Sequence, residues 1–168
     1  MIPVIIMIIS FLLDGILTNF LPYLVDDLSY FTPLFTITSI FLICPFYRKQ
    51  EKNYYIILFV LGILYDLFYT NLLFFHGSLF VILGFISYSF QKNFGLGYLK
   101  NILFVLLIIS SYEILTVLFL MLYNMVPITF NKLVYKISHS LILNIIYADI
   151  IYFIVKMIPK KYKKISIN

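Results

Sequence analysis

Residues 54–90 read YYIILFVLGILYDLFYTNLLFFHGSLFVILGFISYSF, two long apolar runs that hold a single charged side chain, Asp66. The runs 54–70 and 72–90 each approach the length of about 20 residues that a helix needs to cross a bilayer. Only the region around Thr70 and Asn71 joins them. A connection this short makes neighbouring helices antiparallel, so the stretch predicts a hairpin of two membrane helices.

The composition of the whole chain favours the same environment. Of its 168 residues, 63% are hydrophobic and 11% are charged, whereas about 25% are charged in an average soluble domain. A soluble globule of this size could not cover so much apolar surface. This excludes an ordinary soluble enzyme, a disordered tail and a nucleic-acid-binding domain. We expect membrane lipid around the chain and no nucleic-acid partner, because the lysines lie at the ends of apolar runs and form no basic face.

Six apolar stretches are long enough to cross a membrane as helices. They are residues 2–20, 30–46, 54–70, 72–90, 101–123 and 137–158. The first lacks a basic start and a small-residue cleavage site, so we expect it to be a retained span. No connection is long enough to fold separately. The sequence therefore predicts one all-α membrane domain over residues 1–168.

Lysine and arginine give the orientation, because cytoplasmic loops are enriched in them. Ten of the twelve basic residues fall in alternate connections and in the tail, and only Lys132 and Lys136 fall in the others. The first of those other connections carries Asp26 and Asp27. Both termini are predicted to face the cytoplasm.

Four acids lie within the predicted spans: Asp14, Asp66, Glu113 and Asp149. A carboxylate at the bilayer centre costs about 2.5–3.5 kcal/mol on insertion scales, so each is expected to face the bundle interior. Small or polar residues accompany them at helical spacing. The candidates for packing or partner contacts are Asp14, Thr18, Gly62, Tyr65, Asp66, Thr70, Glu113 and Asn144.

The sequence places no basic residue deep in a span to balance these acids. Protonation, hydrogen bonds to hydroxyls and amides, or a partner's positive group could each stabilise them. The acids could therefore hold the helices together, line a transport pathway or dock a partner, and the first interpretation is favoured. For Asp149 we expect a local pair with Tyr152 and Lys156, one and two turns away.

The residues predict no enzyme, no cofactor and no metal site. No pairing of a nucleophile with a base is visible, and the loops are too short to build a site that excludes water. Two histidines, His76 and His139, and the single Cys44 do not supply the ligands of an ordinary zinc site. Each histidine is interpreted as a membrane-interface residue. Motifs of serine proteases, metalloproteases and phosphate-binding loops are not found.

Residues 62–73, GILYDLFYTNLL, resemble the signature of the bacterial rod shape-determining protein MreD family, a Gly-x-Leu-Tyr-Asp-like turn followed by Thr and Leu. Further residues fall where family members have similar ones: Phe11, Asp14, Gly15, Thr18, Glu113 and Asn144. With the length and the six spans, the resemblance covers essentially the whole chain. It departs at His76 and Gly77, where many members have a Leu-Gly pair earlier in the hairpin.

The resemblance implies a non-catalytic component of the bacterial cell-elongation machinery in the plasma membrane. Such a protein would bind the bitopic coiled-coil protein MreC and help couple the MreB cytoskeleton to peptidoglycan synthases. The family is also similar in architecture to the substrate-binding S subunits of energy-coupling-factor vitamin transporters. A transporter subunit is therefore the alternative, and it would need an outward-facing pocket with a few convergent polar groups.

Asp66 carries the most specific structural prediction. Gly62 and Thr70 lie one turn before and after it on the same helix face. We expect Asp66 to face the interior and to tie the 54–90 hairpin to a neighbouring span, with Asp14 and Thr18 as its neighbours.

Overall fold

The chain folds into helices throughout the part that the computed structural model describes, which is residues 2–20, 32–70, 72–94, 97–122 and 130–157. The elements are α1 (Ile2–Phe20), α3 (Phe35–Ile43), the 3-10 helix η1 (Cys44–Tyr47), α4 (Glu51–Tyr65), the π-helical turn η2 (Asp66–Thr70), α5 (Phe75–Phe94), α6 (Tyr98–Leu122) and α7 (Phe130–Met157). The predicted all-α class is confirmed for these residues.

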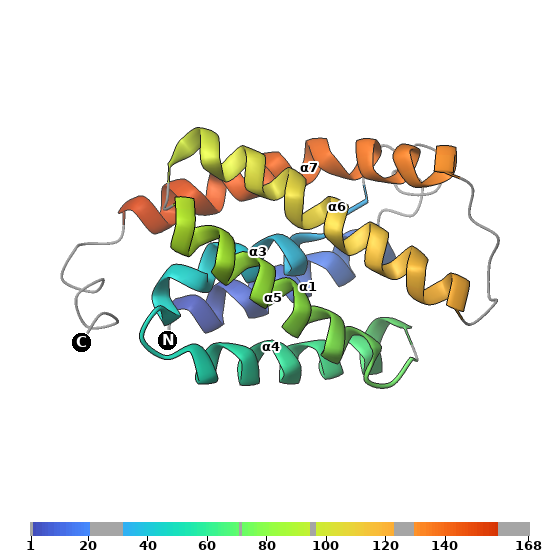
Figure 1. The fold of residues 1–168 in the computed structure, drawn as a ribbon, viewed down its shortest axis with the longest axis horizontal. Helices are drawn as coiled ribbons and strands as arrows, with labels where there is room; N and C mark the ends of the chain where they lie inside the picture. Colours follow the sequence, from blue (N-terminus) through green and yellow to red (C-terminus); the bar gives the residue numbers. More distant parts are fainter. Residues whose placement is uncertain (1, 21–31, 71, 95–96, 123–129, 158–168) are drawn as a thin grey trace.

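Successive helices run in alternating directions (Figure 1). The turn between α4 and α5 and the start of α7 lie at the right-hand end of that view, and the N-terminus lies at the other end. The closest pairs are α1 with α3, α4 with α5, and α6 with α7. The bundle therefore consists of three helical hairpins that reverse at the same end.

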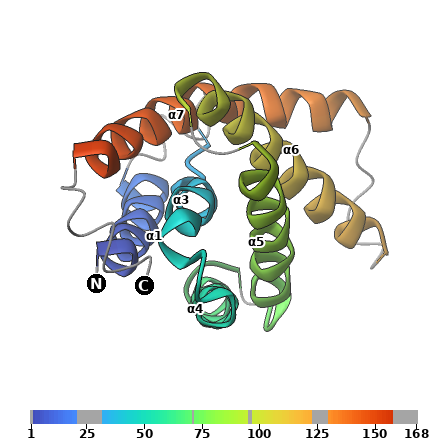
Figure 2. The same ribbon diagram turned by 60° about the vertical axis from the view of Figure 1, so that its left-hand side comes forward.

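The short helix α3 occupies the centre of the bundle (Figure 2). It contacts α1, α5, α6 and α7, and each of its residues is buried. Phe41 stacks on Phe104 of α6 with ring centroids 3.5 Å apart, and Phe35 stacks on Tyr147 of α7 at 4.2 Å. The five surrounding helices all expose large apolar side chains. Lipid tails are as apolar as these side chains, so such outer faces suit a membrane.

Three helices are long and apolar enough to cross a membrane: Glu51–Thr70, Tyr98–Leu122 and Leu133–Met157. Among the described residues, Ile2–Thr18 and Phe35–Tyr47 form shorter apolar helices. The composition and the helix lengths are those of a helical membrane protein.

The central helix is shorter than the predicted span 30–46. It begins at Phe35, and residues 30 and 31 lie outside the described residues. Its nine residues continue directly into η1, and the combined apolar helix Phe35–Tyr47 rises about 21.5 Å, short of the hydrocarbon thickness of about 30 Å. The apolar pattern predicted an ordinary span, but it reflects complete enclosure by other helices.

Two other helices begin at residues that differ from the edges of the predicted spans. Helix α7 begins at Phe130 and not at residue 137, which places Lys136 in the helix and not in a connecting loop. Helix α5 begins at Phe75 and not at residue 72. The preceding Phe74 has a left-handed backbone with φ of 67°, and this conformation belongs to the tight reversal between α4 and α5.

Candidate functional site

The N-terminus of α3 is capped by a side chain from another helix. Leu34, the residue before the helix, makes no capping bond. The buried Asp14 carboxylate of α1 accepts hydrogen bonds from the backbone N–H groups of Phe35 (2.8 Å) and Thr36 (2.9 Å). The first N–H groups of a helix have no partner within it, and leaving them unpaired in a buried site costs about 1–3 kcal/mol each. Asp14 therefore anchors α3 to α1.

Asn144 of α7 bonds to the same end of α3. Its Oδ1 accepts from the N–H of Leu34 at 2.9 Å, and its Nδ2 donates to the carbonyl of Thr32 at 2.9 Å. Nδ2 also donates to Ser140 of its own helix. Asn144 uses both an acceptor and a donor, so an amide is the side chain that this site requires.

The other end of α3 is held in a similar way. The hydroxyl of Tyr54 from α4 donates to the carbonyl of Ile40 at 2.8 Å. The Nε2 of Gln91 from α5 donates to the carbonyl of Phe41, also at 2.8 Å. Side chains from four helices, α1, α7, α4 and α5, therefore bond to backbone groups at the two ends of α3. These bonds take the place of water, which the interior of a membrane does not supply.

Asp66 caps a helix as well. Its Oδ2 accepts from the backbone N–H of His76 at 2.9 Å, at the start of α5. Its Oδ1 lies 2.7 Å from Nδ1 of the His76 ring and accepts from the Thr70 hydroxyl at 3.0 Å. Asp66 is fully buried and His76 is 3% exposed. These bonds join the two helices of the predicted hairpin.

The histidine extends the network to a third helix. Nε2 of His76 lies 3.2 Å from the hydroxyl of Tyr112 on α6. The ring of Tyr65 lies 4.7 Å from the imidazole, so His76 is enclosed by aromatic groups. The order of carboxylate, imidazole and hydroxyl is that of a hydrolytic triad, but all three groups are buried. In this setting the carboxylate fixes the imidazole and the imidazole links α5 to α6.

The prediction for Asp66 was right in its burial and wrong in its neighbours. Its partners lie on its own hairpin and not on α1, where Asp14 bonds to α3. Tyr69 makes the link to α1, because its hydroxyl donates to the carbonyl of Phe11 at 2.8 Å. Thr18 donates to the carbonyl of Asp14 on its own helix.

Gly62 has a separate role in the hairpin. A Cβ atom at this position would collide with the backbone of His76 and Gly77. The absence of a side chain lets α4 approach the start of α5 closely enough for Asp66 to cap it.

Glu113 has a basic partner that the sequence did not reveal. Nζ of Lys136 on α7 lies 3.8 Å from its carboxylate. Glu113 is buried, whereas Lys136 is largely exposed at its head group. Lys136 lies outside the predicted span 137–158, but α7 begins seven residues before that span and carries Lys136 beside Glu113.

The three deepest acids share one arrangement. Asp14, Asp66 and Glu113 each lie toward the end of the first helix of a hairpin and contact the helix that follows. Asp14 and Asp66 accept hydrogen bonds from α3 and α5, and Glu113 forms an ion pair with α7. Asp149 differs, because it lies on the second helix of its hairpin and accepts from Tyr98 (3.3 Å) and Asn101 (3.4 Å) of the preceding helix α6. The predicted local pair of Asp149 with Tyr152 and Lys156 is replaced by these contacts between helices.

Sequence reasoning missed His76, Tyr112, Tyr54 and Gln91. A signal for His76 did exist, since an acid and a histidine flank the short turn of the hairpin. The partners of Tyr54 and Gln91 are backbone carbonyls, which leave no mark in a sequence. Within the described residues, no three His, Cys, Asp or Glu side chains come together to hold a metal ion.

No protein-family model, curated protein or solved structure matches the chain. By its fold and its site, the chain belongs to the class of helical membrane proteins, and its buried acids Asp14, Asp66 and Glu113 bind groups of its own helices.

Proposed function

We propose that the chain is a non-catalytic membrane component of the bacterial cell-elongation machinery, similar to the MreD family. In this proposal it crosses the plasma membrane six times with both termini in the cytoplasm. It binds an MreC-like bitopic coiled-coil protein and, through it, acts with MreB and the peptidoglycan synthases.

One observation carries the proposal beyond the sequence resemblance. Asp14, Asp66 and Glu113 are bound by groups of the protein itself, each at a junction between helices. Carboxylates used in this way hold a bundle together, whereas a transport pathway needs polar groups that face a route for the cargo. A rigid bundle is what a scaffold requires.

The resemblance also falls on a part of the fold where side chains join two helices. Residues 62–73 contain Gly62, which lets the two helices approach, and Asp66, which caps the second helix. These residues build the hairpin itself, which supports the proposal that the resemblance reflects a similar architecture.

A bitopic partner would pack against an outer face of the bundle. Each surrounding helix exposes large apolar side chains, such as Phe85 on α5, Leu118 on α6 and Ile146 on α7. A single partner helix can associate with such a face by van der Waals packing within the bilayer.

The test is purification of the tagged full chain in mild detergent, followed by quantitative mass spectrometry of bound proteins. The proposal predicts enrichment of a bitopic coiled-coil protein over a control purification of an unrelated six-helix membrane protein. Enrichment of an energy-coupling module with its ATPases would contradict it and identify a transporter subunit.

A further inference from the structure

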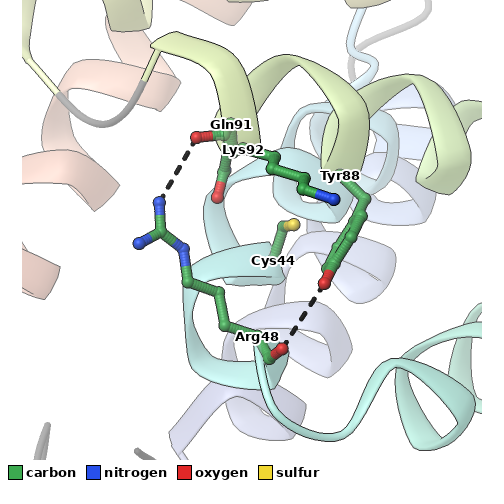
Figure 3. Close-up of a pocket in the computed structure, with 5 residues that line it drawn as sticks. All are labelled: Cys44, Arg48, Tyr88, Gln91 and Lys92. Atoms are coloured by element: carbon green, nitrogen blue, oxygen red, sulfur yellow. Dashed lines mark hydrogen bonds between the residues drawn. The ribbon is translucent and has the colours of Figure 1, made fainter.

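A pocket lies at the opposite end of the bundle from the α4–α5 turn, where α3 passes into η1 beside the last turns of α5 (Figure 3). It is lined by Cys44, Arg48, Tyr88, Gln91 and Lys92. Its volume of about 190 Å³ is far above the roughly 10–15 Å³ that a single water needs. A small polar group with several heavy atoms fits there.

The pocket wall carries two positive charges. The Arg48 guanidinium donates to the backbone carbonyl of Gln91 at 3.3 Å, which fixes its position at the rim and leaves further donors free of that bond. Neither Arg48 nor Lys92 forms an ion pair with a carboxylate among the described residues. The nearby acid, Glu51, accepts a hydrogen bond from the Tyr88 hydroxyl. Two cations against this one acid leave a net positive charge around the pocket, so the pocket favours an anion.

Gln91 adds a requirement for a hydrogen-bond donor. Its side chain is 1% exposed, and its Nε2 is occupied by the carbonyl of Phe41. Its Oε1 has no partner in the described structure, and in Figure 3 this oxygen points into the space between Arg48 and Cys44. A buried acceptor without a partner costs about 1–3 kcal/mol, so a ligand with a hydroxyl or amine beside its anionic group would satisfy it.

The position of the pocket in the bundle indicates which class of anion it binds. The pocket lies at the basic end, which the distribution of lysine and arginine assigns to the cytoplasmic leaflet. Basic pockets between membrane helices on that side bind anionic lipid head groups. Exposed Phe85 lies one turn before Tyr88 on α5, so apolar surface for acyl chains adjoins the pocket.

We infer that this pocket binds the head group of an anionic glycerophospholipid, a phosphodiester that carries a hydroxyl, such as phosphatidylglycerol. Arg48 and Lys92 hold the phosphate, and the Gln91 Oε1 accepts from the hydroxyl. The inference requires placement in a membrane but does not depend on the proposed role in cell elongation.

The test is native mass spectrometry of the full chain, purified in detergent and mixed with equimolar phosphatidylglycerol and phosphatidylcholine. We expect preferential retention of phosphatidylglycerol, reduced about fivefold by Arg48→Gln or Lys92→Gln, because each charge near a lipid surface contributes about 1 kcal/mol. Lys52→Gln removes an exposed charge in the first turn of α4 that does not line the pocket. It should retain the preference.

Two further comparisons identify the source and the second contact. Excess inorganic phosphate should not displace the lipid, and phosphatidylmethanol, an anionic lipid without head-group hydroxyls, should bind more weakly than phosphatidylglycerol. Displacement by phosphate, equal retention of phosphatidylcholine, or equal losses in Lys52→Gln and the pocket variants would overturn the inference. Circular dichroism and size-exclusion profiles confirm that each variant is folded.

Discussion

Asp14 and Asn144 bond to the same end of α3, but the site of Asp14 needs only acceptors, whereas the site of Asn144 needs an acceptor and a donor. Asp14 accepts two backbone bonds, one on each oxygen, whereas Asn144 accepts one and donates two. The two side chains have almost the same shape. Exchanging carboxylate and amide therefore tests hydrogen bonding with little change in packing.

At Asp14, we predict that Asp14→Asn destabilises the protein by about 1–2 kcal/mol and Asp14→Leu by about 2–5 kcal/mol. Asn keeps one acceptor, while Leu leaves two buried N–H groups unpaired. Unfolding of the purified protein in detergent measures both. Asp149→Asn is the control, since its bonds are long and its site is partly exposed, and it should change stability by less than about 0.5 kcal/mol.

At Asn144, the isosteric Asn144→Asp is predicted to cost about 1–3 kcal/mol, because it turns a donor into an acceptor facing the carbonyls of Thr32 and Ser140. The same unfolding measurement applies. Wild-type stability for Asn144→Asp would show that these bonds do not hold α3.

At Asp66, we expect Asp66→Asn to be less damaging than Asp66→Leu. The Asn side chain keeps one oxygen that accepts from Thr70 or His76. Its NH₂ group takes the place of the other oxygen and faces an N–H from which it cannot accept. Membrane abundance and partner co-purification measure the difference. If Asp66→Asn is folded but as defective as Asp66→Leu, the charge itself is functional and the structural role fails.

At the scale of the elements, the hairpin of α4 and α5 depends on close backbone approach. We predict that Gly62→Ala destabilises it by about 1–3 kcal/mol, because the added methyl meets the backbone of His76 and Gly77, which cannot move aside as a side chain can. Gly77→Ala is the matched control, since its methyl makes ordinary contacts with the Ile63 and Phe59 side chains. Equal effects of the two changes would contradict this account.

The helices were predictable to different degrees. Long apolar runs bounded by polar residues gave α1, α4 and α6 within a few residues. The run around α3 looked like any other span, because a helix enclosed by protein and a helix enclosed by lipid are both apolar on every side. Its N-terminal end is held by Asp14 and Asn144, which come from distant parts of the chain.

The candidate site was also predictable only in part: the burial of its acids was predicted, and their partners were not. The cost of a carboxylate in a membrane was sufficient to predict that Asp14, Asp66 and Glu113 face inward, and all three are buried. Their partners could not be predicted, since two of the acids bind backbone N–H groups, which every residue except proline offers. The partner of Glu113 depended on where α7 begins.

At the scale of the whole molecule, the distribution of basic residues gives a prediction of topology. After Cys44 is replaced, a single cysteine at Asp27 should react with a membrane-impermeant reagent in intact cells, and one at Lys52 should not. Labelling of position 52 without permeabilisation would reverse the orientation and place the basic pocket in the outer leaflet.

The proposed function is tested most directly by depleting the chain in a rod-shaped host and measuring the length-to-width ratio of the cells. The account predicts that the cells become round and that the wild-type chain alone restores the rod, with no correction by added nutrients. Cells that keep their shape, or that recover normal growth when one small nutrient is supplied, would contradict the account and favour a transporter.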